Sequence, residues 1–292
     1  AFDAEAAGFE TVTLKDLMRL PSDAGRADTE RTLPSAPYRT HAIAHKGGCC
    51  AIAVQNPGHL AASCGMDRDV ALWDVNAVGR SVGPVMSLGG MMGAVNDVAF
   101  TCDAAQVLGA GADKSLHVWD ATTGSARHTM TGHAGPVVCV APSPLDARLA
   151  VSAGEDRCLK LWDLGRGYAA RSVPCAKMPN ALAMSRDGNT IVTGHLDGSV
   201  CLWDVRQARG GATGPLAEAR LFTQIVSYVG VTPSDSVLLA ASKDNSVALW
   251  DFRTLTTTRT LRAHAFTLGT IGSMGKGRCV ADMSPDGRFV AA

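Results

Sequence analysis

All five tryptophans of the chain are followed by aspartate, and this dipeptide recurs at an almost constant interval. Successive tryptophans are 46, 43, 41 and 47 residues apart. Another aspartate stands six residues before each tryptophan, so two spacings repeat together. The tryptophans are Trp73, Trp119, Trp162, Trp203 and Trp250, and the earlier aspartates are Asp67, Asp113, Asp156, Asp197 and Asp244. Few folds are compatible with a repeat of this length that preserves both positions.

An internal period in the forties that ends in Trp-Asp predicts a β-propeller, in which each repeat forms a four-stranded blade. Turn signals such as SPLDAR and SRDGNT separate the predicted strands of each repeat. The segments that carry small apolar residues are LAASCG, VLGAGA, LAVSAG, TIVTGH and LLAAS. We expect these segments to be inner strands packed on neighbouring blades. The predicted fold is all-β, with five complete blades and a partial sixth.

The repeats occupy residues 41–292, whereas residues 1–40 have no repeat character. We expect residues 1–40 to be a flexible linker, with a possible short helix at residues 13–20 that Pro21 would end. At the other end, residues 284–292 (SPDGRFVAA) match the loop and second strand of a sixth repeat that begins near His264. Because no sixth Trp-Asp follows, we expect the chain to be a fragment of a longer propeller or a shortened gene product.

Two repeats carry a histidine 28 or 29 residues before the tryptophan, with a serine between them. The two sets are His45, Ser63, Asp67 and Trp73, and His133, Ser152, Asp156 and Trp162. They resemble the buried relay of WD-repeat propellers, whose rings usually close with seven blades. The resemblance implies that the histidine bonds the turn aspartate and that the serine and the indole complete the network. The other three repeats lack this histidine, so we expect them to be less rigid.

The composition favours an interaction domain over an enzyme. Lysine plus arginine and aspartate plus glutamate number 27 each, so no net charge attracts nucleic acid or an anionic membrane. The nine cysteines are odd in number, form no C-x-x-C pair and mostly lie in apolar stretches. This pattern predicts buried thiols in the reducing cytoplasm, and we expect no metal or cofactor. A Ser-His-Asp trio suggests a hydrolase, but its spacing follows the blades, so we interpret it as structural. The glycine-rich stretch at residues 268–277 does not match a phosphate-binding loop.

Two groups of basic residues are candidates for partner binding. Arg68, Lys114 and Arg157 each follow a turn aspartate and Lys243 precedes one, so a basic ring could receive an acidic peptide at one mouth. Solvated turn residues are the competing and favoured interpretation. The sequence W-D-x-R occurs twice, with Arg206 and Arg253. It resembles the docking motif of substrate receptors of cullin-four ubiquitin ligases, which is the alternative function.

Several phrases outside the positions that the fold requires resemble the propeller of the autophagy-related protein 16 family, in its plant and algal versions. They include AHKGGCCAI at residues 44–52, RHTMTGH at residues 127–133 and NALAMSRDG at residues 180–188. The resemblance implies a non-enzymatic scaffold that joins the conjugate of autophagy-related proteins 5 and 12 and directs lipidation of the ubiquitin-like autophagy-related protein 8. The regions that bind this conjugate precede the propeller in the family and are missing here.

For the propeller itself, the resemblance implies recognition of membrane-associated or ubiquitin-tagged protein partners. It also implies a cytoplasmic protein that is recruited to pre-autophagosomal membranes. We expect no nucleic-acid binding and no direct membrane insertion, because the chain has neither a basic excess nor an apolar run of membrane-spanning length.

Overall fold

The computed structural model describes residues 45–56, 58–76, 83–206, 214–232, 237–244, 246–251, 254, 256–262, 282–283 and 290–291. The predicted linker and short helix of residues 1–40 lie outside the described residues, as do Arg253 and the glycine-rich stretch at residues 268–277. Within the described part the protein is built from strands.

Five four-stranded antiparallel sheets follow one another along the chain, which confirms the predicted all-β propeller. The first sheet contains β1 (Cys49–Val54), β2 (Leu60–Gly65), β3 (Val70–Asp74) and β4 (Met86–Leu88). The second contains β5 (Val95–Phe100), β6 (Gln106–Gly111), β7 (Ser115–Asp120) and β8 (Ala126–Thr131). The third contains β9 (Val137–Pro142), β10 (Leu149–Gly154), β11 (Cys158–Asp163) and β12 (Tyr168–Pro174).

The fourth sheet contains β13 (Pro179–Met184), β14 (Thr190–His195), β15 (Ser199–Asp204) and β16 (Ala217–Arg220). The fifth contains β17 (Val226–Val231), β18 (Val237–Ser242), β19 (Ser246–Asp251) and β20 (Thr256–Arg262). Two further short strands, β21 (Asp282–Met283) and β22 (Val290–Ala291), pair with each other. In every sheet the strands pair in chain order, so each repeat is a meander.

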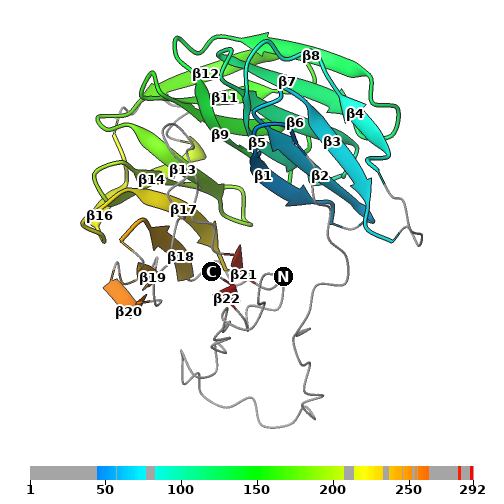
Figure 1. Cartoon of the computed structure of the whole chain (residues 1–292). Helices are drawn as coiled ribbons and strands as arrows, with labels where there is room; N and C mark the ends of the chain where they lie inside the picture. The colour runs from blue at the N-terminus through cyan, green and yellow to red at the C-terminus, as the bar shows by residue number, and fades with distance from the viewer. Residues whose placement is uncertain are drawn as a thin grey trace, which may run out of the picture.

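The five sheets follow an arc around a common centre (Figure 1). The first strands of successive sheets (β1, β5, β9, β13 and β17) contact one another and lie nearest the centre. The prediction that segments such as LAASCG are the inner strands is therefore wrong, because these segments are the second strands, including β2, β10 and β14. Second strands are small and apolar because neighbouring blades cover their faces. This pattern does not indicate how far a strand lies from the centre.

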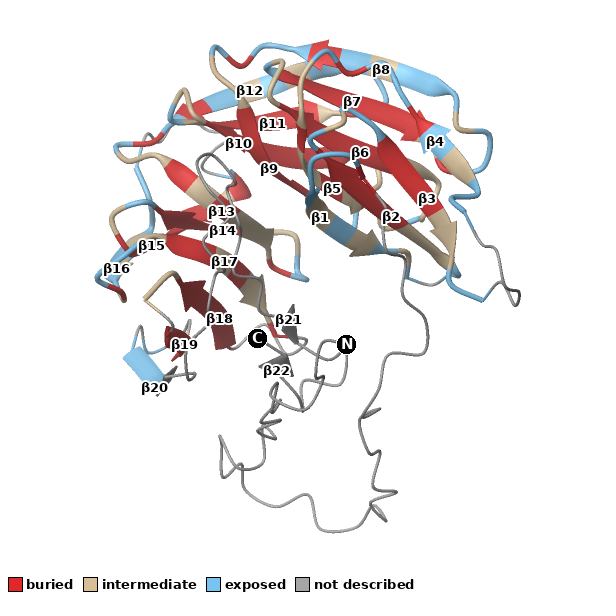
Figure 2. Ribbon diagram, in the orientation of Figure 1, coloured by how far each residue is buried: buried red, intermediate tan, exposed pale blue. Residues whose placement is uncertain are grey.

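The hydrophobic core is divided among the gaps between consecutive sheets. Each of the four buried clusters combines residues of two neighbouring sheets, and each includes one of the tryptophans Trp119, Trp162, Trp203 or Trp250. Figure 2 shows this burial in the second and third strands, while the outer fourth strands are largely exposed. The repeated tryptophan thus packs each blade against the one before it.

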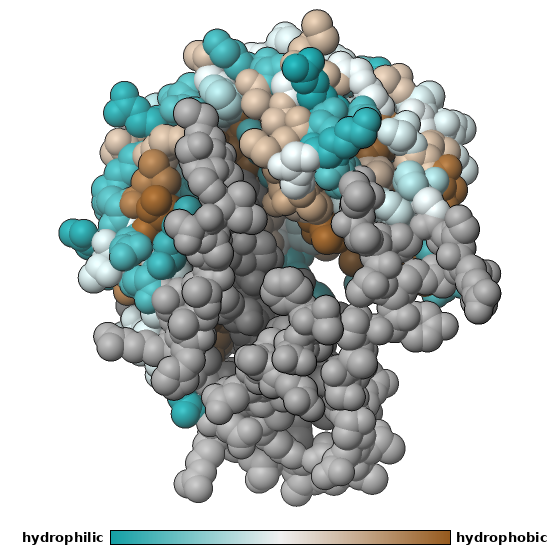
Figure 3. Space-filling model, in the orientation of Figure 1, coloured by the Kyte–Doolittle hydropathy of each residue, from teal (hydrophilic) through white to brown (hydrophobic). Residues whose placement is uncertain are grey.

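Among the residues that the structure describes, one face of the first sheet has no such partner. Ile52 and Val54 on β1 are 69% and 65% exposed, whereas the equivalent Val98 and Phe100 on β5 are 5% and 9% exposed. Figure 3 shows hydrophobic surface at the end of β1. This face has the side chains of an interface between blades but is open to solvent.

Candidate functional site

The first and third blades each contain a buried hydrogen-bond relay. In the third, His133 Nδ1 lies 2.9 Å from Asp156 Oδ2 and His133 Nε2 lies 2.7 Å from Ser152 Oγ. The indole Nε1 of Trp162 donates to the same Ser152 oxygen at 2.7 Å. Because the carboxylate accepts from Nδ1, Nε2 is left to accept the hydroxyl proton.

The first blade repeats these contacts with His45, Ser63, Asp67 and Trp73. His45 Nδ1 is 2.9 Å from Asp67, His45 Nε2 is 2.7 Å from Ser63, and Trp73 Nε1 donates to Ser63 at 2.8 Å. The structure therefore places both predicted sets as connected networks, in which the histidine and the serine are buried.

The turn aspartates of the first three blades also hold the turn between the second and third strands against the loop that leads into the blade. Asp67, Asp113 and Asp156 accept a backbone N–H from that loop, donated by Lys46, Met92 and Ala134. Partial burial raises the pKa of each carboxyl, but the hydrogen bonds outweigh burial and hold the pKa below its ordinary value. These carboxylates are therefore ionised near neutral pH and fix the position of the turns.

As expected, the three remaining blades have no histidine at the loop position. In two of them a histidine on a strand nevertheless stands near the turn aspartate. In the second blade, His117 on β7 lies 3.5 Å from Asp113 and stacks on Trp119. In the fourth, His195 at the end of β14 is buried, and its Nε2 lies 2.9 Å from Thr193 Oγ1. Trp203 Nε1 donates to the same Thr193 oxygen at 2.9 Å, so this blade has a relay of its own.

The fourth blade also carries a small network of charged groups. Lys177 Nζ lies 2.6 Å from Asp197 Oδ2, and it also pairs with Glu218 on β16. Hydrogen bonds to these two carboxylates raise the pKa of Lys177. Burial raises the pKa of Asp197, but the hydrogen bonds from Lys177 and Ser199 lower it to about 2. Lys177 thus satisfies the turn aspartate that a loop histidine binds in the first and third blades.

A hollow lies at the central mouth, at the end of the propeller that carries these turns. Equivalent positions on the five first strands contribute to its wall, namely Cys50, Asn96, Val138, Asn180 and Ser227. The rim around the fourth and fifth blades is apolar and consists of Met178, Leu196 and Ile225. Glu155 and Lys243 place one charge of each sign on the same rim.

The wall of the hollow is held by contacts between blades. Asn96 Nδ2 donates to the carbonyl of Val137 at 2.7 Å, and Asn180 Nδ2 donates to that of Val226 at 2.8 Å. Each amide therefore joins a first strand to the first strand of the next blade. The mouth is a preformed concave surface with a few polar groups, which is the usual character of a binding site.

Of the four residues of the predicted basic ring, Lys243 alone lines the hollow. Arg68, Lys114 and Arg157 are exposed on the neighbouring turns, with positive φ angles of 70°, 70° and 58°. Gly198 occupies the same turn position in the fourth blade, with φ 84°. Arg206 is exposed after β15, at the opposite end of the propeller, and Arg253 lies outside the described residues.

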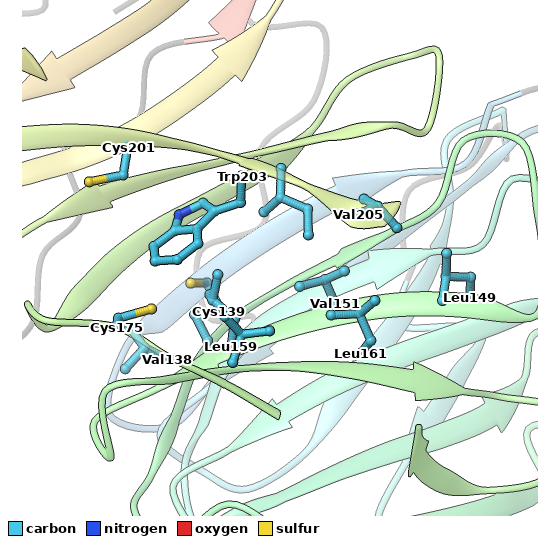
Figure 4. Packing of buried hydrophobic residues seen from close by; sticks show 13 residues of the cluster. Val138, Cys139, Leu149, Val151, Leu159, Leu161, Cys175, Cys201, Trp203 and Val205 are labelled. Atoms are coloured by element: carbon cyan, nitrogen blue, oxygen red, sulfur yellow. The ribbon is translucent and has the colours of Figure 1, made fainter. Parts of the chain in front are cut away.

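The described cysteines form no disulfide bond, and several are buried in the interface between the third and fourth blades. Figure 4 shows the Trp203 ring between Cys201 on one side and Cys139 and Cys175 on the other. Burial raises the pKa of Cys175 and Cys201 to about 12. Neutral thiols of this kind pack as small apolar side chains. Among the described residues, no group of three or more potential ligands could hold a metal ion.

The repeated sheets, the relays and the central mouth define the chain as a β-propeller of the WD-repeat class. The family profile described as "WD domain, G-beta repeat" matches residues 37–74, 83–120, 124–163, 175–204 and 221–251, so the chain belongs to this family. It is similar over 99% of its length to Autophagy-related protein 16 of Arabidopsis thaliana, with 35% identity, and covers 54% of that protein.

Other relatives differ more in the share of the chain that they match. Protein tipD of Dictyostelium discoideum is 28% identical over 92% of the chain, which covers 41% of that protein. Pre-mRNA-splicing factor cwf17 of Schizosaccharomyces pombe is 30% identical over 51% of the chain, and the matched part covers 43% of that protein. The chain therefore spans about half the length of the curated relatives it matches, or somewhat less. No helix among the described residues is both long and apolar enough to cross a membrane.

Proposed function

We propose that this chain is the protein-binding propeller of an autophagy scaffold that helps to direct lipidation of the ubiquitin-like autophagy-related protein 8. The observation that carries the proposal is the similarity to Autophagy-related protein 16, which extends over 99% of the chain and is not confined to the repeats. The chain acts in this proposal by binding proteins and not by catalysis.

The central mouth is the surface that we assign to partner binding. An apolar rim of Met178, Leu196 and Ile225 beside Lys243 suits a peptide segment with an apolar side chain and a neighbouring carboxylate. The exposed cations Arg68, Lys114 and Arg157 on the surrounding turns would attract such an acidic segment. The partners would be membrane-associated or ubiquitin-tagged proteins, and the protein would act in the cytoplasm at forming autophagosomes.

Regions outside this chain would bind the conjugate of autophagy-related proteins 5 and 12. The proposal therefore concerns the gene product of which the propeller is a part. The relevant experiment disrupts the native gene, restores the complete product, and measures the lipidated fraction of protein 8 after starvation by its shift on gels. We expect the fraction to fall on disruption and to recover on restoration. An unchanged fraction after disruption would rule out the proposed function.

A further inference from the structure

The fourth blade reverses the arrangement of its relay. In the first and third blades the relay histidine is in the loop, four residues before the first strand, and a glycine ends the second strand. The histidines are His45 and His133, and the glycines are Gly65 and Gly154. In the fourth blade the loop position is Cys175 and the last residue of the second strand is His195. The histidine is therefore on the strand and the small residue is in the loop, which is the reverse of the other two blades.

The two arrangements exclude each other sterically. A Cβ added at Gly65 would lie 2.7 Å from the Cβ of His45, and one added at Gly154 would lie 2.7 Å from Nδ1 of His133. A loop histidine therefore requires glycine on the strand, and a strand histidine requires a small loop residue. His195 nonetheless reaches the same target, because its Nε2 contacts the hydroxyl that accepts the tryptophan N–H.

The reversal leaves the second ring nitrogen without a carboxylate. His45 and His133 place Nδ1 on the turn aspartate, but Asp197 is engaged by Lys177 and Ser199. Nδ1 of His195 is buried and has no hydrogen-bond partner among the described residues. Burial lowers the pKa of His195, and the nearby charges are Asp197, which favours the proton, and Lys177, which opposes it. Glu218 pairs with Lys177, and the thiols of Cys175 and Cys201 stay neutral.

A backbone carbonyl that interacts with the His195 ring belongs to Met178, which is part of the mouth. The carbonyl of Met178 accepts the backbone N–H of Leu196 at 3.2 Å, and both residues belong to the apolar rim. The carbonyls of Met178 and Lys177 both interact with the His195 ring without reaching hydrogen-bond geometry, and Met178 is the one of the two that lines the hollow. Thr193 Oγ1 donates to the carbonyl of Cys201 at 3.5 Å, so Nε2 of the neutral ring donates to Thr193 and Nδ1 carries no proton. A second proton on the ring would therefore turn Nδ1 into a buried donor that competes with Leu196 for the Met178 carbonyl.

We propose that His195 is a positioning residue for the mouth: the neutral ring leaves the backbone bond between Leu196 and Met178 intact, and the protonated ring competes for the Met178 carbonyl and loosens the rim. The loosening of the rim on protonation of His195 involves residues of the fourth blade alone and needs no partner. The consequence that partner binding weakens on acidification rests on the proposed function. The two are tested separately, because the response of the rim is measured without a partner.

The experiment follows the chain between pH 7.5 and pH 5, with the His195 ring observed by NMR and the Leu196 amide by hydrogen exchange. The exchange rate is divided by that of an unstructured peptide at the same pH, which gives a protection factor. We expect the protection factor of Leu196 to fall about tenfold with the midpoint at which His195 titrates. A constant protection factor while His195 becomes protonated would overturn the proposal.

Two variants assign the response to His195. His195→Gln cannot take up the proton and should make the Leu196 protection independent of pH, whereas His59→Gln, at an exposed position, should leave the response unchanged. Cys175→His combined with His195→Gly restores the arrangement of the first and third blades, and should also remove the response if His195→Gln does not fold. A pH response of Leu196 that persists in either His195 variant would contradict the proposed role.

Discussion

At the scale of single residues, one hydroxyl oxygen in each relay joins a histidine to a tryptophan. Ser152 Oγ is within 2.7 Å of both His133 Nε2 and Trp162 Nε1, and Ser152 and Trp162 have no exposed surface. Removing this oxygen would leave two buried ring nitrogens without partners, and a buried unsatisfied group costs about 1–3 kcal/mol. The equivalent Ser63 serves Trp73, which is only partly buried.

We therefore predict that Ser152→Ala lowers the free energy of unfolding by roughly 2–3 kcal/mol, and that Ser63→Ala lowers it by less. Water can reach the partly buried Trp73 and replace the lost acceptor in the first blade. Urea unfolding of both variants, followed by tryptophan fluorescence, measures the difference. Equal losses in the two variants would show that burial of the indole does not determine the cost.

The turn after the second strand requires a left-handed residue, and the chain meets this requirement in two ways. Lys114 has φ 70°, where a side chain costs about 1–2 kcal/mol, and Gly198 has φ 84°. A Cβ added at Gly198 would collide with the carbonyl oxygen of Phe222. We predict that Lys114→Gly raises the free energy of unfolding by about 0.5–1 kcal/mol and that Gly198→Ala lowers it by at least about 2 kcal/mol.

Thermal unfolding of the two turn variants is the appropriate measurement, with Lys114→Ala as the control that removes the charge and keeps the Cβ. A stabilisation by Lys114→Ala equal to that of Lys114→Gly would attribute the effect to charge and not to the backbone.

The relay residues of the first and third blades could be predicted because their spacing repeats. His195 could not, because the repeated spacing marks a histidine in the loop, whereas the His195 ring enters from the end of a strand. A signal was nevertheless present, since TIVTGH ends in histidine where LAASCG and LAVSAG end in glycine.

At the scale of elements, the first strands are equivalent in sequence but not in environment. Val98 on β5 packs in the interface between the first two blades, whereas Ile52 occupies the same position on β1 and faces solvent. Alternation of side chains predicts which residues share a face of a strand. It does not predict whether a neighbouring blade covers that face, which is a property of the assembled sheets.

This difference gives a matched pair of substitutions. Val98→Asp places a carboxylate in a closed apolar interface and should lower the free energy of unfolding by at least about 3 kcal/mol. Ile52→Asp changes an exposed side chain and should cost less than about 1 kcal/mol. Chemical unfolding of both variants of the chain makes the comparison. A large loss for Ile52→Asp would mean that the face of the first sheet is covered in solution.

At the scale of the whole molecule, the ionisable groups act together on stability. Burial lowers the pKa of His117, His133 and His195, so the unfolded chain binds more protons than the folded chain below about pH 6.5. The turn aspartates have folded pKa values below their ordinary values, as low as about 2 for Asp197. Their stabilisation is complete above about pH 4 and is lost as the pH falls towards 2.

We predict that the free energy of unfolding decreases in two stages on acidification, first as the pH falls below about 6.5 and again below about 4. Urea unfolding at a series of pH values measures both stages. His133→Gln should reduce the first stage and leave the second. A stability that is constant between pH 7 and pH 5 would contradict the assignment of neutral buried histidines.

The fold was predictable at this scale because the tryptophan period determines the number of blades. The candidate basic residues Arg68, Lys114, Arg157 and Lys243 lie at the end of the propeller that carries the hollow, whereas Met178, Leu196 and Ile225 were not predicted. Met178 and Ile225 directly precede a first strand, and Leu196 directly precedes the turn aspartate. The sequence at these points shows no alternation of apolar and polar residues that would mark them. Only the arrangement of the sheets around the centre brings them together.

The central claim is that the apolar rim of the mouth binds a partner at forming autophagosomes. The most direct measurement compares Leu196→Asp with Leu145→Asp, an exposed leucine at the opposite end of the propeller, in the complete native gene product. The quantity measured is the fraction of the product found on structures marked by autophagy-related protein 8 after starvation. We predict that Leu196→Asp lowers this fraction and that Leu145→Asp does not. Equal recruitment of the two folded variants would contradict the claim.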